Sequence, residues 1–375
     1  MKFQIPVQVI YKTVNQLSGV AVSSAKDEIV QNILIKVSNN ELILRATDYG
    51  VEVTTTLALV NDGDSVVDGE TTVNASKFSQ VLSKIQNVAN AVFTVVEDEM
   101  TIETDASTFK LRTRNSRDFP VFDSEETSQK IVISQKKLKS IIDRSSFCVS
   151  LDDFREYLKG IRLEADGDTL SVFTSDGHRM AILETKLDVP VESFLGVSLI
   201  KKCATEIAKL LSPSDDLVEL SFSKNTVVTQ INNTKLTSKL LVCGYPNVRA
   251  VIPKVYSTYT VPRATTNELI STVAILSSKR LNGVTMNFTK DKLSLRSENS
   301  EHEEASSSLA ITNDNDPVEI SLNASYVNET LGTIRSQNVN FCFAQPVSNA
   351  MIEADSYDEN DCGVTARYII SRVVV

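Results

Sequence analysis

The stretch with the greatest chemical potential is TSDGHRM, Thr174 to Met180, which places a hydroxyl, a carboxylate, an imidazole and a guanidinium within seven residues. It holds His178, one of only two histidines in the chain. A hydrolase would need this imidazole to meet a nucleophile and an orienting group from separate elements. Alternatively, Asp-Gly is a turn signal, and the polar side chains would stabilise that turn. The stretch alone leaves both interpretations open.

The rest of the sequence offers no catalytic or metal-binding pattern. It contains no GxSxG, HExxH, Walker or glycine-rich dinucleotide motif. His302, in SEHEEAS, has no second metal ligand at helical spacing. The five cysteines are far apart and form no CxxC pair, which is typical of buried thiols in a reducing cytosol. We therefore expect no catalytic residue, no metal, no cofactor and a cytoplasmic location.

Length and composition indicate a globular protein of several domains. A chain of 375 residues exceeds one ordinary core, so two or three domains are expected. No apolar run is long enough to span a membrane, and no apolar segment follows the MKFQIP start as a secretory signal would require. A net charge of −10 disfavours a simple nucleic-acid binder, although one face can still be positive.

A threefold repeat organises the chain. The segments KFQIPVQVIYKTVNQL, KIVISQKKLKSII and TYTVPRATTNELISTVAIL each predict a strand followed by a helix. Pro6, Ser134 and Pro262 take equivalent places in them, 128 residues apart. LILRATD, LSVFTSD and the looser LSLRSEN recur in the same frame, and VNASKFSQVL matches LNASYVNETL. The chain therefore contains three copies of one unit.

The repeat predicts three similar domains, 1–127, 128–254 and 255–375, each with two helices and about eight strands. Alternating stretches such as FKLRT and KLTSKLL indicate half-buried antiparallel strands. Helices grouped on one face of antiparallel sheets define the α+β class.

These motifs together resemble a known family. TSDGHRM, SKLLVCGYPNVRAVIPK, VAILSSKRLNGV and the threefold plan are similar to the bacterial sliding clamp, the β subunit of the replicative DNA polymerase, over essentially the whole chain. The resemblance implies three clamp domains that form half of a six-domain ring, closed as a head-to-tail homodimer around double-stranded DNA. It implies a processivity factor without catalysis, which tethers the replicative polymerase, the clamp loader and repair proteins through short linear peptides.

Elementary geometry is compatible with such a ring. A domain of this size has a radius of gyration of about 14 Å and occupies a sphere about 36 Å across. Three touching spheres leave a hole of only about 6 Å, whereas six leave one of about 36 Å. A duplex roughly 20 Å wide therefore requires two chains.

The resemblance also implies a hydrophobic peptide-binding groove, of which the TSDGHRM turn forms one wall. Its residues are Leu158, Ser175, Gly177, His178, Arg179, Met180, Pro246, Val251, Val347, Asn349, Ser371, Arg372 and Val373. The sequence departs from the family at Ser371 and Arg372, which replace an apolar pair, and at Ala250, where Arg is frequent. We expect the groove to be present and its preferred peptide to differ.

Two further surfaces follow from the resemblance. The expected DNA contacts are Lys77, Lys84, Lys136, Lys137, Tyr157, Lys201 and Lys202. The expected dimer contacts are Phe109, Leu111, Ile275 and Leu276. Ser24 and Glu156 stand where the family often has an arginine and an aromatic residue, so we expect no DNA contact through either.

Two alternatives remain open at this stage. The chain could be a monomeric β-rich adaptor that binds peptides without encircling DNA, or a hydrolase that uses His178. Scattering would distinguish a ring from a monomer, and measurable turnover that is lost in a His178→Ala variant would indicate an enzyme.

Overall fold

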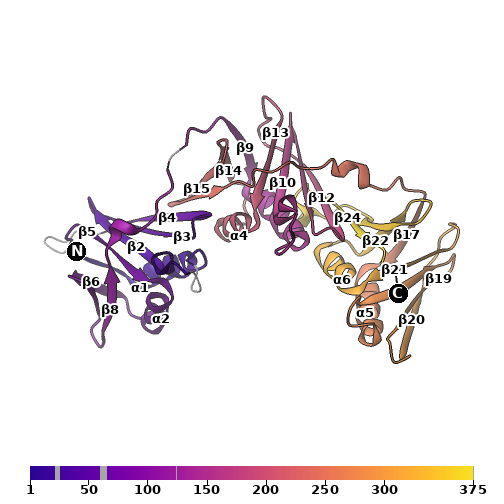
Figure 1. Cartoon of the computed structure of the whole chain (residues 1–375), viewed down its shortest axis with the longest axis horizontal. Helices are drawn as coiled ribbons and strands as arrows, with labels where there is room; N and C mark the ends of the chain where they lie inside the picture. Colours follow the sequence, from indigo (N-terminus) through magenta and orange to yellow (C-terminus); the bar gives the residue numbers. More distant parts are fainter. Residues whose placement is uncertain (22–25, 60–65, 124, 375) are drawn as a thin grey trace. The chain divides into compact units, whose positions relative to one another are not determined.

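The computed structural model describes residues 1–21, 26–59, 66–123 and 125–374. Each third of the chain contributes two α-helices and eight strands, and in every third the first helix follows the first strand and the second follows the fifth (Figure 1). All paired strands of known register run antiparallel, for example β3 with β4 and β11 with β12. The α+β class with three similar domains, predicted from the repeat, is confirmed.

The six helices begin where the repeated motifs predict. Pro6, Ser134 and Pro262 are the residues before the first helix of each third. The asparagines of the two Asn-Ala-Ser stretches cap the second helices of the first and last thirds, with Asn74 Oδ1 accepting from Lys77 N at 3.1 Å. The helices are α1 (Val7–Leu17), α2 (Ala75–Ile85), α3 (Gln135–Ser145), α4 (Lys201–Leu210), α5 (Arg263–Val273) and α6 (Ala324–Thr333).

The strands follow the same order in each third. The first third contains β1 (Lys2–Pro6), β2 (Asn32–Ser38), β3 (Glu41–Thr47), β4 (Val51–Ala58), β5 (Gly69–Asn74), β6 (Asn90–Val96), β7 (Glu99–Glu103) and β8 (Thr108–Arg114). The second contains β9 (Gln129–Ser134), β10 (Gly160–Asp166), β11 (Thr169–Ser175), β12 (Arg179–Lys186), β13 (Leu195–Ile200), β14 (Leu217–Phe222), β15 (Thr226–Ile231) and β16 (Thr234–Lys239). The third contains β17 (Ser257–Pro262), β18 (Gly283–Phe288), β19 (Lys292–Glu298), β20 (Glu304–Ala310), β21 (Val318–Asn323), β22 (Asn338–Phe343), β23 (Asn349–Ala354) and β24 (Thr365–Ser371).

The repeated LILRATD-type motif ends in a turn that all three copies share. The side-chain oxygen of Asp48 accepts two backbone N–H groups of the residues that follow, at 2.9 and 2.7 Å. Asp176 does the same at 2.9 and 3.0 Å, and Asn299 at 2.9 and 3.1 Å. Such Asx turns favour Asp and Asn. The carboxylate of the TSDGHRM stretch is thus part of the fold.

The sheets join neighbouring thirds through one kind of edge contact. The group β5-β2-β3-β4 of the first third continues through β4 and β16 into β16-β15-β14-β9 of the second. The group β13-β10-β11-β12 likewise continues through β12 and β24 into β24-β23-β22-β17 of the third. The strands of the second and last thirds therefore complete the sheet of the third that precedes them.

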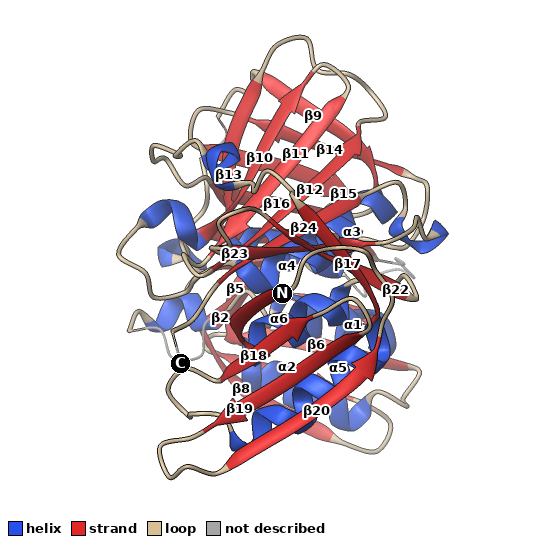
Figure 2. Cartoon of the chain, turned by 90° about the vertical axis from the view of Figure 1, so that its right-hand side faces the viewer, coloured by secondary structure: helices blue, strands red, loops and turns tan. Residues whose placement is uncertain are grey.

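These continuous sheets divide the chain into two compact units. One unit comprises residues 1–132, 202–211 and 217–240, and the other comprises 133–201, 212–216 and 241–375. In the first unit α1 and α2 lie side by side (Figure 1). In the second, the strands β18 to β20 cover α5 and α6 (Figure 2).

A buried ion pair ties the second and last thirds together inside the second unit. Arg144, on α3, lies 3.1 Å from the carboxylate of Asp361 and donates to the carbonyl of Val364 at 3.0 Å. Both charged side chains are less than one-tenth exposed. Tyr368 donates to the carbonyl of Arg144 at 3.1 Å. Arg144, although it lies on a helix rich in lysines, is therefore a structural residue.

We expect an Arg144→Ala variant to be strongly destabilised in the second unit. Removing one partner of a buried pair leaves an uncompensated charge and costs about 3–5 kcal/mol. Hydrogen exchange of the β24 amides should report this loss. Lys139→Ala, on the same helix, breaks an exposed pair with Asp143 and should cost below about 1 kcal/mol. Equal effects of the two substitutions would contradict a structural role of the buried pair.

Candidate functional site

The candidate site lies on an apolar row that crosses the eight-stranded sheet. Met180, Ile369, Met351 and Cys342 are register neighbours on β12, β24, β23 and β22. All four are buried, in one cluster with Phe173, Ile182 and Val248. Val248 belongs to the segment between β16 and β17, which crosses this sheet face and covers part of the row. A groove remains where this segment leaves the row uncovered.

The groove has a volume of about 300 Å³ and brings together residues from distant parts of the chain. Ten of the residues that sequence reasoning assigned to it line it: Leu158, Ser175, Gly177, His178, Arg179, Met180, Pro246, Val251, Asn349 and Ser371. Leu158 and Met180 are buried at its floor, whereas Pro246 and Val251 are exposed at its rim. An apolar floor with a few polar groups is typical of a site for small or extended ligands.

The wall of the groove is a fixed hairpin turn. Ser175 Oγ donates to the carbonyl of Arg179 at 2.7 Å and accepts from the N–H of Gly177 at 3.0 Å. The hydroxyl is thus used inside its own turn. Among the described residues, no hydrogen bond joins the His178 imidazole to a nucleophile or a carboxylate. The arrangement lacks the contacts of a catalytic triad and supports a binding surface.

Arg179 anchors this wall to the last third of the chain. Its guanidinium donates to Asp176 at 3.0 Å and to the carbonyl of Phe147 at 2.8 Å, and it pairs with Glu329 of α6. It also lies over the ring of Tyr326, 4.3 Å from the centroid. The side chain is only 9% exposed. Arg179 therefore positions the wall, with its charge paired and each of its three nitrogens already donating.

Gly177 and Arg155 form one end of the groove. Gly177 has a φ of +88°, and a Cβ at this position would lie 2.5 Å from the Arg155 guanidinium. Arg155 is held by Asp153 through two hydrogen bonds, at 2.9 and 2.8 Å. These bonds lower the pKa of Asp153 to about 2. Because that pKa is depressed, the stabilisation is complete above the ordinary value of 3.8 and is lost only as pH falls towards 2, so this end stays fixed at neutral pH.

Two tyrosines also line the groove, Tyr157, which sequence reasoning had assigned to DNA, and Tyr245, which it missed. Tyr245 packs edge-on to Tyr157, with ring centroids 6.0 Å apart, and lies under the Arg162 guanidinium. Burial raises the pKa of Tyr245. Arg155, Tyr245, Asn247, Val248 and Ile369 also line the groove. The GYPNV stretch and the alternation in YIIS could have indicated Tyr245, Val248 and Ile369. Nothing local in the sequence marks Arg155.

The remaining predicted groove residues lie in a neighbouring hollow. Val347, Arg372 and Val373 line a second depression of about 400 Å³, together with residues of β21 and the chain end. The two depressions are adjacent because Ser371, in the groove, directly precedes Arg372. Val373 N donates to the carbonyl of Ser321 at 2.8 Å, which holds the tail against β21.

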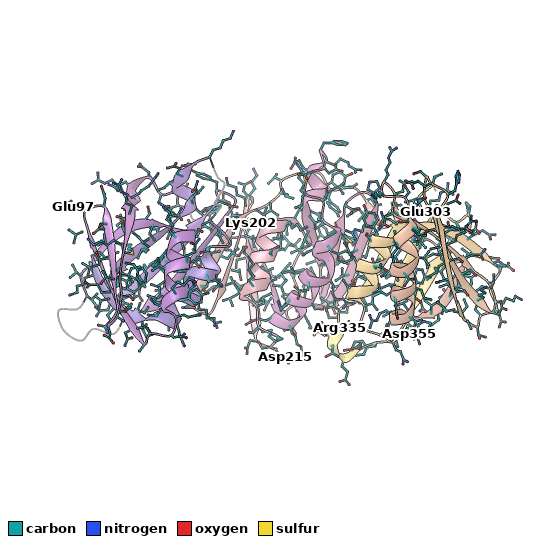
Figure 3. All side chains as sticks on the ribbon, turned by 90° about the horizontal axis from the view of Figure 1, so that it is seen from below. Glu97, Lys202, Asp215, Glu303, Arg335 and Asp355 are labelled. Carbon is teal, nitrogen blue, oxygen red and sulfur yellow. The ribbon has the colours of Figure 1, made fainter. Side chains whose placement is uncertain are left out.

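The cations predicted to meet DNA fall into two groups. Lys77 and Lys84 are exposed on α2. Lys136 and Lys137 pair with Asp215 and Asp188, at 2.5 and 3.1 Å. Lys202, labelled in Figure 3, pairs with the turn residue Asp48 at 2.7 Å, and Lys201 approaches the carbonyl of Val149 at 3.5 Å. Tyr157 lies at the groove, and Ser24 lies outside the described residues. These placements leave the DNA contacts as predictions.

Two kinds of feature are absent from the described part of the chain. None of its helices is both long and apolar enough to cross a membrane. No group of three or more His, Cys, Asp or Glu side chains there could hold a metal ion. The groove is therefore the feature that the fold offers for function.

Fold and groove together define a class of protein: a triplicated binding protein whose apolar groove lies where the second third of the chain meets the last. Models of the DNA polymerase III beta subunit match residues 1–123 (N-terminal domain), 132–247 (central domain) and 249–364 (C-terminal domain). The chain belongs to the DNA polymerase III beta subunit family, the bacterial beta sliding clamps. It is accordingly a processivity factor of DNA polymerase III and not an enzyme.

The individual relatives agree over their full length. The beta sliding clamp of Vibrio cholerae is 30% identical, over 94% of this chain and 96% of the relative. That of Escherichia coli K12 is 27% identical, over 94% and 96%. The crystal structure of the Pseudomonas aeruginosa DNA polymerase III subunit beta superposes with a TM-score of 0.92 at 27% identity, covering all of both chains.

We expect Gly177→Ala to weaken binding of an apolar peptide to the groove, because the new methyl group would displace the Arg155 guanidinium from its end wall. Gly167→Ala is a matched control: Gly167 also has a positive φ, +54°, but nothing lies within 4 Å of its Cβ position. Both substitutions should cost about 1–2 kcal/mol of stability. Fluorescence anisotropy should show weaker binding for Gly177→Ala alone, and equal binding by both variants would contradict this account.

Proposed function

We propose that two copies of this chain close head to tail into a ring that encircles double-stranded DNA, and that the groove tethers polymerase, clamp loader and repair proteins by short peptides. The observation that supports a ring is that the sheet of one third of the chain continues into strands of the next third. Two of the three strand groups of the type β5-β2-β3-β4 find a continuation in the next third. The third group, β21-β18-β19-β20, has no next third within the chain.

Each end of the chain retains one half of such a contact. β20 is the edge of its four-stranded sheet. β8, the counterpart of β16 and β24, pairs with β7 along its length but with β5 only through residues 113 and 114. Residues 108–112 therefore present an open edge among the described pairings. Open strand edges favour pairing with another chain, and matching edges at opposite ends give a head-to-tail contact.

The internal contacts supply the register for this seam. Backbone N–H groups of Leu59, Leu187 and Ile311 make equivalent bonds just beyond β4, β12 and β20. The backbone N–H groups of Thr113, Leu240 and Arg372 make a second set of equivalent bonds, near the C-terminal ends of β8, β16 and β24. In the pairs Thr55–Thr234 and Leu183–Ala366, the first residue lies four positions before Leu59 or Leu187, and the second lies six positions before Leu240 or Arg372. Counting back in the same way from Ile311 and Thr113 places Ser307 opposite Ser107 of the other copy.

The residues along this register are complementary. It sets the small Ala305 opposite Phe109 and the acidic Glu304 opposite Lys110, and such cross-strand pairs stabilise antiparallel edges. Phe109 and Leu111 are only half-buried in the isolated chain, and Ile275, which follows α5, is 78% exposed. Leu276 is partly exposed as well. These four apolar residues therefore have area left to bury at a seam.

The expected grip on DNA is electrostatic and independent of base sequence. Lys77 and Lys84 extend from α2 into solvent, and Lys136, Lys137 and Lys202 keep part of their side chains exposed beside their carboxylates. Contacts of this kind to phosphates are weakened by salt and permit sliding. Retention then depends on closure of the ring rather than on affinity.

The groove suits an extended peptide with an apolar anchor. Its buried floor, Leu158, Met180 and Ile369, would desolvate a side chain such as Leu or Phe, which contributes about 1.5–3 kcal/mol per residue. Asn349 lines the groove, and its amide oxygen is buried without a hydrogen-bond partner among the described residues. A peptide N–H would satisfy that acceptor and orient the chain.

We expect cysteines at Ser107 and Ser307 to form a disulfide between two copies under mild oxidation. In the transferred register the two residues form a non-hydrogen-bonded pair, in which opposite Cα atoms lie about 4.5 Å apart. The partly exposed Cys243 and Cys362 are first replaced by serine. Non-reducing electrophoresis should show a covalent dimer. Cysteines at Ser107 and Ala305, two residues out of register, should not crosslink, and equal crosslinking of both pairs would refute the register.

Topological retention tests the ring itself. We expect the chain, once loaded on a nicked circular duplex, to survive a high-salt wash, because salt weakens phosphate contacts but does not open a closed ring. Linearising the circle should release it. Equal loss from circular and linear DNA would favour the monomeric adaptor and exclude encirclement.

A further inference from the structure

We propose that Arg372 makes the groove selective for peptides that carry a carboxylate close to their apolar anchor. This selectivity rests on the proposed peptide-binding function and names the class of peptide. The carboxylate can come from an acidic side chain or from the C-terminus of the peptide. Both offer the same planar pair of oxygens, which suits the fork of N–H donors on a guanidinium.

Arg372 lines the hollow that neighbours the groove at the chain end. Ser371 lines the groove, and Arg372, the next residue, lines the neighbouring hollow with Val347 and Val373. The backbone N–H of Arg372 approaches the carbonyl of Ser348 at 3.4 Å, beside the groove residue Asn349. An extended peptide advances about 3.3 Å per residue, so a carboxylate one or two residues from the anchor would lie beyond the apolar floor, on the scale of the step from the groove to this hollow.

The other arginines of the groove are already paired. Arg155 is held by Asp153, and Arg179 by Asp176 and Glu329. In contrast, none of the ion pairs formed by the described residues includes Arg372. The acidic residue that shares its hollow, Glu319, instead accepts a hydrogen bond from the Asn287 amide at 3.1 Å. Arg372 therefore retains its full donor capacity for a ligand.

The surroundings of Arg372 also favour a ligand that combines apolar groups with one charge over a ligand that is only charged. The hollow is lined by Val347, Val373, Val374 and Ile320 in addition to Glu319. Partial exclusion of water by these side chains strengthens a charge-assisted hydrogen bond relative to one in open solvent. The nearby Glu319 carboxylate would repel a peptide with several acids, so a single carboxylate beside an apolar pair fits best.

Fluorescence anisotropy with three labelled peptides tests the proposal on the full chain. The peptides share an adjacent Leu-Phe pair. One carries Asp two residues before the pair and an amidated C-terminus, the second carries Asn there with the same amide, and the third carries Asn with a free C-terminal carboxylate. We expect a carboxylate peptide to bind about fivefold tighter than the neutral one at low salt, with the gap shrinking as salt rises. Comparing the first and third peptides identifies which carboxylate is bound.

Two variants make the result specific to one side chain. Arg372→Gln should bind all three peptides alike, at the affinity of the neutral one. Arg335→Gln changes an exposed arginine of the same unit, which donates to the carbonyl of Asn360 and is labelled in Figure 3, and should keep the gap. Equal binding of all three peptides by the unmodified chain, or a gap that persists in Arg372→Gln, would overturn the selectivity. If no peptide binds the unmodified chain, the groove itself is not a peptide site and the proposed function fails with it.

Discussion

The structure depends on the hydrogen-bonding demand of strand edges. A sheet edge leaves backbone N–H and C=O groups unpaired, and β4 and β12 satisfy theirs with β16 and β24 of the following third. Each junction is thereby part of a continuous sheet and cannot slip without exposing its apolar faces. The Asp48–Lys202 and Arg179–Glu329 pairs then tie the turn at each junction to a helix of the next third. A chain built by this rule is complete only when its first and last edges are also paired.

The architecture could be predicted from sequence because the repeat carries local signals. Pro6, Ser134 and Pro262 mark helix starts by their own backbone preferences, and Asp48, Asp176 and Asn299 mark one turn by side-chain hydrogen bonds to neighbouring N–H groups. Interactions over long sequence distances gave no such signal. Arg144 looks like its exposed neighbours on α3, but its partner Asp361 lies 217 residues later; Lys202 similarly meets an acid of the first third. Whether a cation is free depends on such distant partners, which a single sequence does not reveal.

The groove was predictable in position and less so in composition. Leu158 and the turn from Ser175 to Met180 are contiguous in short motifs, so the resemblance could place them. Tyr245, Val248 and Ile369 enter through packing: the segment between β16 and β17 must cover an apolar row, and the residues that it contributes depend on how it crosses the sheet. Packing also decides that Arg372 lies in the neighbouring hollow and not on the groove floor. A change of one residue along the tail moves a side chain from one depression to the next.

The repeat also explains why this groove lies in the second unit although the same sheet junction recurs in the first. The row that reads Met180, Ile369, Met351 and Cys342 in the second unit reads Glu52, Thr237, Val228 and Ser221 in the first. Glu52 accepts a hydrogen bond from the N–H of Phe122 at 3.1 Å, and the Lys239 ammonium lies 5.8 Å from the Phe122 ring, so the first unit binds its own connecting segment on this row. At the proposed seam the equivalent positions are Glu304 and Lys110, both charged. Because burying a polar row without partners costs free energy, only the second unit can offer an apolar floor to an outside peptide. A single architecture thus yields two junctions within the chain, and the one in the second unit leaves part of its apolar row open to a ligand.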